Sequence, residues 1–232
     1  FVTMKKFTLA VFVLLVIALA VVIYYVFYNL DAIVKAAIEK YGSEAVHTRV
    51  NVDKVKIELT KGKGTIQGLT IANPGGFSLP FVFSLGEITT KINIDKTSQD
   101  LIVIDLISIG APEIFYEINA ERLGNLNVIN KNLSQGATGT SSAPAAKDES
   151  ASSIQLAVAR FELNDTVLEA KIVPLKNKTY SLKLPPLTLS NLRGTPQQIS
   201  NQALKQIIKH AETTIRKQGL DQELAKLKTK AK

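Results

Sequence analysis

The pattern of apolar and polar positions divides the chain into an apolar start, a long part that alternates with period two, and a helical end. The 22 residues from Phe7 to Tyr28 include no charged residue, glycine, proline or asparagine. A helix of this length spans about 33 Å, enough to cross a hydrocarbon core of about 30 Å. Because a soluble helix has no reason to be apolar on every face, we predict a transmembrane helix over 7–28.

The charges around this run predict its orientation. Lys5 and Lys6 stand directly before it, whereas the residues just after it (NLD) include no basic cluster. By the positive-inside rule, residues 1–6 form a cytoplasmic tip and the bulk of the chain lies on the far side of the membrane. A cleaved signal peptide is the alternative, since residues 18–20 (ALA) have the form of a cleavage site. Cleavage there would leave an apolar N-terminus, so we favour the anchor; whether Met4 is the true start stays open.

Beyond the apolar run, the spacing of apolar residues predicts a helix over 31–45 and then strands. The strands are recognised by period-two alternation, which places one face toward a core and one toward water. Gly68 shifts the phase of one of them, as a β-bulge would. The segment 101–109 is apolar on both faces, which predicts a central or doubly covered strand, and 121–133 fits a short helix or a loop. The predicted strands are 50–60, 65–72, 82–95, 101–109 and 113–119.

A segment of low complexity separates these strands from the next ones. Residues 134–153 contain no aromatic and no large aliphatic side chain. Such a composition cannot bury enough apolar surface to offset the entropy of ordering, so we predict a flexible linker or loop. Alternation returns over 154–173, with Asn164–Asp165 as the expected hairpin turn, and a strand over 180–189 follows.

The last part of the chain, 195–232, is predicted to form a basic amphipathic helix. Thr195 and Pro196 are typical of a helix start, and Gly219 divides the helix from a Lys-rich end. The whole chain carries a formal charge of +8, and eight Lys or Arg residues against three acids give this part +5. The helix either packs on the sheet or lies on the membrane surface. Nucleic acid is not an expected partner, because the helix contains no aromatic residue and the domain is exported.

Three segments in this order resemble the AsmA-like proteins, a bacterial envelope family anchored by one N-terminal helix. The segments are LTIANPGGF (69–77), IVIDLISIGAPEI (102–114) and GNLNVI (124–129). The resemblance covers 30–133, is weaker over 154–193, and implies a short, single-anchor member of the inner membrane with a periplasmic body. It also implies a curved, incompletely closed sheet with an apolar inner face, and long members are implicated in phospholipid handling. About eight strands span only about 40 Å, too short for a long conduit.

Pattern and resemblance together predict a mainly β fold of the α+β type. It comprises an N-terminal transmembrane helix, a curved antiparallel β-sheet or partly open β-sandwich, and a C-terminal amphipathic helix. The β domain is expected in two parts, on either side of the linker. The expected divisions are 1–6, 7–28, 29–133, 134–153, 154–194 and 195–232.

The residue types present favour a non-catalytic protein. The chain contains no cysteine, which excludes disulfides and cysteine chemistry and is compatible with a bacterial envelope protein. Its two histidines, His47 and His210, lie far apart in the sequence, and no nucleophile elbow, phosphate loop or metal-ligand pair is present. The acidic residues are spread singly, mostly on predicted wet strand faces, as in Asp105 and Glu117. We therefore expect no catalytic residue, no cofactor and no metal.

The candidate contact residues are apolar. The loop NPGGF and its surroundings offer Phe77, Phe81 and Phe83 to a lipid or a partner, although the same loop is also explained as a tight turn that tucks Phe77 into the core. Ile104 and Ile107 are the candidates on the inner face of the sheet. Lipid binding or phospholipid handling is the first functional hypothesis. The alternative is a scaffold or assembly subunit that binds envelope proteins, or a water-stress-type β domain. The two hypotheses differ in the inner face of the sheet, which stays open to a ligand in the first and is filled by the protein's own side chains in the second.

Overall fold

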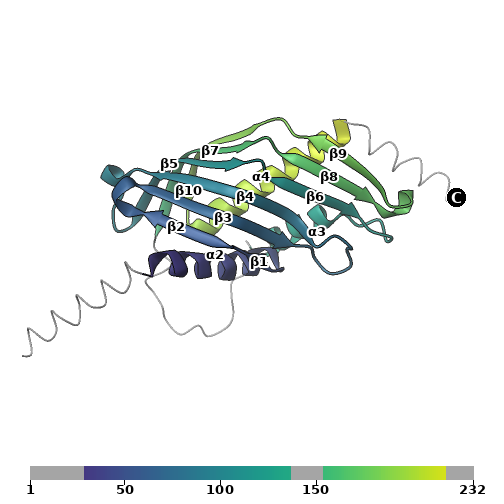
Figure 1. Ribbon diagram of the computed structural model, residues 1–232, viewed down its shortest axis with the longest axis horizontal. Helices are drawn as coiled ribbons and strands as arrows, with labels where there is room; N and C mark the ends of the chain where they lie inside the picture. The colour runs from purple at the N-terminus through teal and green to yellow at the C-terminus, as the bar shows by residue number, and fades with distance from the viewer. Residues whose placement is uncertain (1–28, 137–153, 218–232) are drawn as a thin grey trace, which may run out of the picture.

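The computed structural model describes residues 29–136 and 154–217, and its elements are mainly β-strands (Figure 1). The helices are α2 (Leu30–Val46), α3 (Asn125–Gly136) and α4 (Pro196–Lys217), with one-turn helices η1 (Leu59–Lys61), η2 (Ile94–Lys96) and η3 (Val173–Leu175). The strands are β1 (Val50–Asn51), β2 (Lys54–Glu58), β3 (Lys63–Ala72), β4 (Phe81–Ile92), β5 (Leu101–Gly110), β6 (Glu113–Ile118), β7 (Gln155–Asn164), β8 (Val167–Ile172), β9 (Lys178–Lys183) and β10 (Leu187–Gly194). The prediction of a mainly β fold with a helix near its C-terminus is confirmed.

The predicted span over 7–28, most of the predicted linker and the Lys-rich end lie outside the described residues. Within 29–136 and 154–217, no helix has the length and apolar character that crossing a membrane requires. Two boundaries differ from the prediction. The strand expected over 50–60 divides into β1, β2 and η1, and α3 continues through the first three residues of the predicted linker.

The ten strands form six long rows of one curved, open sheet. β1 and β2 lie end to end in the first row, and β3 and β4 are the next two. In each of the other three rows, two strands also lie end to end: β5 with β6, β7 with β8, and β9 with β10. The two strands of such a row both pair with strands of the same neighbouring row. The rows therefore follow one another across the sheet in the order in which they follow one another in the sequence.

The sheet is mixed, which corrects the prediction of an antiparallel sheet. β7 runs parallel to β5, and β8 runs parallel to β6. A parallel pair needs a long crossover connection, and here that connection is the segment between β6 and β7 that contains α3. Asn164–Asp165 is therefore not a hairpin turn, because it joins β7 to β8 within one row and leaves the direction of the chain unchanged.

A line of irregular residues, which we call the crease, crosses all six rows at the same level. The pairing between neighbouring rows keeps its register through the crease. For example, Leu163 lies opposite Leu187 on one side of it, and Val167 lies opposite Lys183 on the other, so both rows advance by four residues. Positive φ angles break the pleat at Gly68, Ala111 and Asp165. Coordinated breaks of this kind let a sheet bend without changing its pairing. The crease comprises Val52–Asp53, Gly68, Gly86, Ala111–Pro112, Asp165–Thr166 and 184–186.

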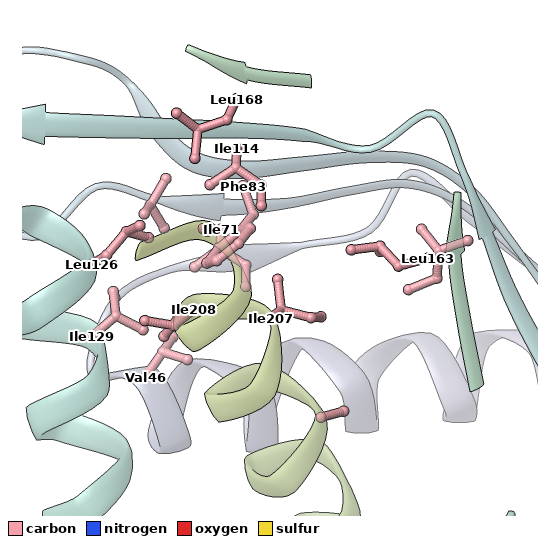
Figure 2. Close-up of a cluster of buried hydrophobic side chains, with 14 of the residues drawn as sticks. Val46, Ile71, Phe83, Ile114, Leu126, Ile129, Leu163, Leu168, Ile207 and Ile208 are labelled. Atoms are coloured by element: carbon pink, nitrogen blue, oxygen red, sulfur yellow. The ribbon is translucent and has the colours of Figure 1, made fainter. Parts of the chain in front are cut away.

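The helices α2, α3 and α4 pack on one face of the sheet and contribute to a common core (Figure 2). α4 buries the stripe that its sequence predicts, including Ile199, Ile207 and Ile208, so this helix covers the sheet over 196–217. α3 adds Leu126, Ile129 and Leu133, and α2 adds its last two residues. Burying a large aliphatic side chain contributes about 1.5–3 kcal/mol, so this face is the main source of stability. Opposite the helices, the core residues of the sheet include Ile71, Phe83, Ile114, Phe161, Leu163 and Leu168.

α2 also covers the edge of the sheet that β1 and β2 form. Four polar side chains, spaced four residues apart on one side of the helix, bond to the outward backbone of that edge. Asp31 and Glu39 accept the N–H groups of Ile57 and Val52, at 2.7 and 2.9 Å. Ser43 accepts the N–H of Val50 at 2.9 Å, and Lys35 donates to the carbonyl of Val52. An edge satisfied in this way is closed to pairing with another strand.

Candidate functional site

The five contact residues that the sequence predicts do not form a common surface. Phe83 and Ile104 are core residues, with 2% and 9% of their surface exposed, and Ile107 is partly buried against both core clusters. Phe77 is half-buried in the loop before β4, and Phe81, at the start of β4, is 37% exposed. An apolar inner face is present, but α2, α3 and α4 cover it with their own side chains. Within the described residues, it offers no open groove to a ligand.

The loop over 73–80 is held by a buried carboxylate. Glu117 is 1% exposed, so it does not lie on a wet strand face as its sequence position suggested. Its carboxylate accepts the N–H of Ser78 at 2.9 and 3.0 Å, the Ser78 hydroxyl at 2.9 Å and the N–H of Leu79 at 2.8 Å. Lys171 donates to the Ser78 hydroxyl at 2.7 Å. A buried carboxylate with this many donors is satisfied, which is the usual condition of a buried charge.

Two buried asparagines complete the support of this loop. The Asn119 amide donates to the carbonyl of Gly76 at 3.2 Å, and the Asn125 amide donates to the Asn73 side chain at 3.0 Å. Gly76 has φ +91°, a conformation that glycine adopts without strain. These contacts explain the NPGGF motif as a tightly built turn, the second of the two interpretations that the sequence allowed.

The two histidines are accounted for by their surroundings. His47 ends α2 in the left-handed conformation, with φ 54°. The Nε2 of His210 lies 2.8 Å from the carbonyl of Pro185, to which it donates. In the part of the chain that the structure describes, no three His, Asp or Glu side chains gather closely enough to hold a metal ion.

One end of the sheet, which we call the proximal end, is built by the start of α2 and by the turns that hold η1 and η2. The bond from Ile57 to Asp31 brings the first turn of α2 to the end of β2. The N–H of Ile92 donates to the carbonyl of Gly62 at 2.7 Å, and a side chain at Gly62 would touch Ile94, so the two turns lie against each other. Figure 1 shows this end at the left and the loop over 73–80 at the opposite, distal end.

A depression of about 340 Å³ opens at the proximal end on the outer face of the sheet, away from the helices. Val103, Ala157 and Arg193 form one row across β5, β7 and β10. Because Val158 points into the core, its neighbours Ala157 and Ala159 face outward, and their small side chains leave the hollow. The lining comprises Lys96, Leu101, Val103, Ala157, Val158, Ala159, Asn191, Leu192 and Arg193.

The two charged residues that line the depression are both basic. Lys96 and Arg193 are exposed, and neither forms an ion pair with a described residue. An apolar floor with cations beside it can hold an anionic amphiphile, because the cations bind its head while the floor takes its apolar part. Sequence reasoning missed this site, since only strand pairing brings residues 96, 157 and 193 together. The local signal was the pair of alanines in an otherwise bulky strand.

Further lysines surround the proximal end. Lys63 and Lys91 lie directly opposite each other on β3 and β4 and form no ion pair with a described residue. Like charges at such positions destabilise a sheet, so the pair has a cost in stability. Lys61, in contrast, is paired with an acid, Glu58. The hydrogen bond and ion pair with Lys61 hold the pKa of the Glu58 carboxyl below its ordinary value. The same contact raises the pKa of the Lys61 ammonium.

In comparisons with known proteins, no family model and no curated protein matches this chain.

Proposed function

We propose that this protein is a single-pass, membrane-anchored domain of the bacterial envelope, similar to the AsmA-like proteins, that binds phospholipid without catalysing a reaction. The observation that carries the proposal is the outer-face depression, where Lys96 and Arg193 lie beside an apolar floor. The predicted span over 7–28 supports the location. The three segments that resemble the AsmA-like proteins support the envelope role.

The filled inner face counts against lipid binding on that face, so lipid binding is proposed for the outer face alone. A conduit would carry acyl chains along the inner face of the sheet, but helices occupy that face in the described residues. The proposed contact therefore lies on the outer face and takes one lipid at a time. The phosphate would lie between Lys96 and Arg193, and the upper part of an acyl chain would lie against Val103 and Ala157.

The energies involved are modest. A basic residue near an anionic lipid surface contributes about 1 kcal/mol, and arginine adds the geometry that suits a phosphate. Two such cations with a small apolar contact favour reversible binding. Reversible binding suits a protein that handles or senses lipid, and no catalytic group is needed for it.

A scaffold that holds an envelope protein is the second candidate. It is favoured by two exposed apolar side chains at the distal end, Phe81 at 37% and Leu123 at 56%. Exposed apolar side chains would contribute to a contact with a protein partner if they belonged to one continuous patch. In this role the filled inner face serves as rigid support for the distal loop.

Native mass spectrometry of the purified full chain tests the proposal. We expect phospholipid to co-purify, and we expect the double variant Lys96→Glu/Arg193→Glu to lower its occupancy at least about tenfold, since two attractive charges become repulsive. The matched control is Lys183→Glu, another exposed lysine, on β9. Lipid occupancy that is the same in both variants contradicts the proposed site. A stable protein partner with no bound lipid favours the scaffold.

A further inference from the structure

The end of the predicted membrane span determines which part of the domain is nearest to the bilayer. The apolar run stops at Tyr28, and α2 begins at Leu30. The carbonyl of Asn29 already accepts the N–H of Ile33 at 2.9 Å, so the first turn of α2 is formed directly after the span. Asp31 then ties this turn to β2. With so little chain in between, the proximal end cannot lie far from the membrane surface.

The proximal end carries exposed apolar side chains at the tips of its turns. Ile33 is 45% exposed in the first turns of α2, Leu59 is 43% exposed in η1, and Ile94 is 51% exposed in η2. The contacts of Gly62 with Ile94 and of Ile57 with Asp31 place these three elements side by side. Apolar side chains at the tips of adjacent turns suit the boundary between headgroups and acyl chains.

Basic side chains surround these tips. Lys61 follows Leu59 in the same turn and is paired with Glu58, and Lys96 follows Ile94 by two residues, with Asp95 between them. Lys63 and Lys91 stand on the adjoining strand ends and form no ion pair with a described residue. Lysines of this kind are attracted to anionic lipid headgroups, and they also extend toward the headgroup layer from an apolar base. The like-charged pair of Lys63 and Lys91 becomes favourable if an anionic surface lies in front of it.

We propose that the proximal end of the domain rests on the membrane that holds residues 7–28, with Leu59 and Ile94 inserted at the level of the lipid headgroups. This inference rests on the proposed membrane anchor but not on the depression. Because the rows of the sheet run from the proximal to the distal end, β4 alone, with 12 residues, places the distal loop about 40 Å from the bilayer. The depression on the outer face then opens close to the lipid that it would bind.

The chain contains no tryptophan, so a single introduced tryptophan reports its own position. The full-length variants Leu59→Trp and Ile94→Trp are reconstituted into vesicles of phosphatidylethanolamine and phosphatidylglycerol whose acyl chains are brominated. Bromine quenches tryptophan fluorescence only at short range. The matched control is Leu123→Trp, which replaces a leucine at the distal end that is 56% exposed, somewhat more than Leu59 and Ile94.

We expect the fluorescence of both proximal variants to fall at least twofold in brominated vesicles, relative to vesicles without bromine, while Leu123→Trp is unchanged. Quenching of Leu123→Trp in place of the proximal variants, or no quenching of any variant, would overturn the inference. Carbonate washing of the same vesicles tests the anchor separately. A chain that carbonate removes lacks the proposed anchor, whereas a chain that resists carbonate but is not quenched loses only the proposed orientation.

Discussion

The two ends of the sheet differ in how the segments that connect the strands are held. At the distal end, the loop over 73–80 is held by the buried groups Glu117, Asn119 and Asn125, which bond its backbone and side chains. At the proximal end, the turns leave Leu59 and Ile94 exposed and place lysines beside one another. Buried polar groups stabilise the distal end, whereas the exposed apolar side chains and the lysine pair of the proximal end lower the stability of an isolated domain.

The difference separates structural from functional features. The distal loop contains the most conspicuous motif of the sequence, yet its residues are explained by the turn that they build. The proximal turns contain no motif, yet they leave apolar side chains exposed and place two lysines directly opposite each other. Features that cost stability are the ones for which a function is needed as an explanation.

Removing the carboxylate of Glu117 is expected to have the largest effect on the distal end. Glu117→Ala leaves the partly buried N–H groups of Ser78 and Leu79 without their acceptor, so we expect the free energy of unfolding to fall by about 1–3 kcal/mol. Denaturant unfolding measures this loss, and the rate of amide hydrogen exchange over residues 76–79 should rise with it. Glu113→Ala, an exposed acid on the same strand, is the control and should change stability by less than about 0.5 kcal/mol. Equal effects of the two variants would contradict the structural role of the loop network.

α2 links the two ends, and Glu39 tests how firmly it holds the sheet edge. The N–H of Val52 is the main cause that lowers the pKa of the Glu39 carboxyl below 4.5, with a smaller contribution from Lys35. A lowered pKa stabilises the folded state above the unfolded value, and this contribution is lost as the pH falls through the folded value. We expect Glu39→Gln to lower the free energy of unfolding by about 1 kcal/mol at pH 7, and the difference from the unmodified chain to shrink below pH 4.5.

Denaturant unfolding at several pH values measures this trend. Glu44→Gln, which changes an exposed acid on the same helix, serves as the control. A stability difference for Glu39→Gln that does not change between neutral and acidic pH would show that the carboxylate charge has no part in holding the edge.

The smallest expected effect on stability comes from the lysine pair at the proximal end, and its sign is the informative result. Lys91→Glu replaces a repulsive neighbour of Lys63 with an attractive one, so we expect the free energy of unfolding to rise by about 0.2–1 kcal/mol. Binding of the full-length protein to anionic vesicles should weaken in the same variant. A gain in stability together with a loss of lipid contact would show that the pair is kept for function. A loss of both would identify the pair as structural.

Local pattern determined most of the elements. Period-two alternation located the strands because the side chains of a strand point to alternate faces wherever its partners lie. Thr195 was recognised as a helix cap, and the structure confirms a reciprocal pair in which the N–H of Gln198 donates to the Thr195 hydroxyl at 3.3 Å and the N–H of Thr195 to the Gln198 side chain at 2.9 Å. The apolar stripe of α4 was evident for the same reason, since both signals depend on residues within a few positions of one another.

Tertiary structure decided what depends on residues far apart in the chain. The parallel pairing of β7 with β5 follows from a crossover that no turn motif reveals, and it turns Asn164–Asp165 from an expected hairpin into a point on the crease. An inward isoleucine has the same pattern in a core and in an open groove, so only the placement of α4 showed that Ile104 is covered. The depression between Lys96 and Arg193 likewise exists only because pairing brings three separate strands together. The sequence by itself determined which faces are apolar, and the tertiary contacts determined what covers each face, because burial is a property of the neighbours that a segment acquires on folding.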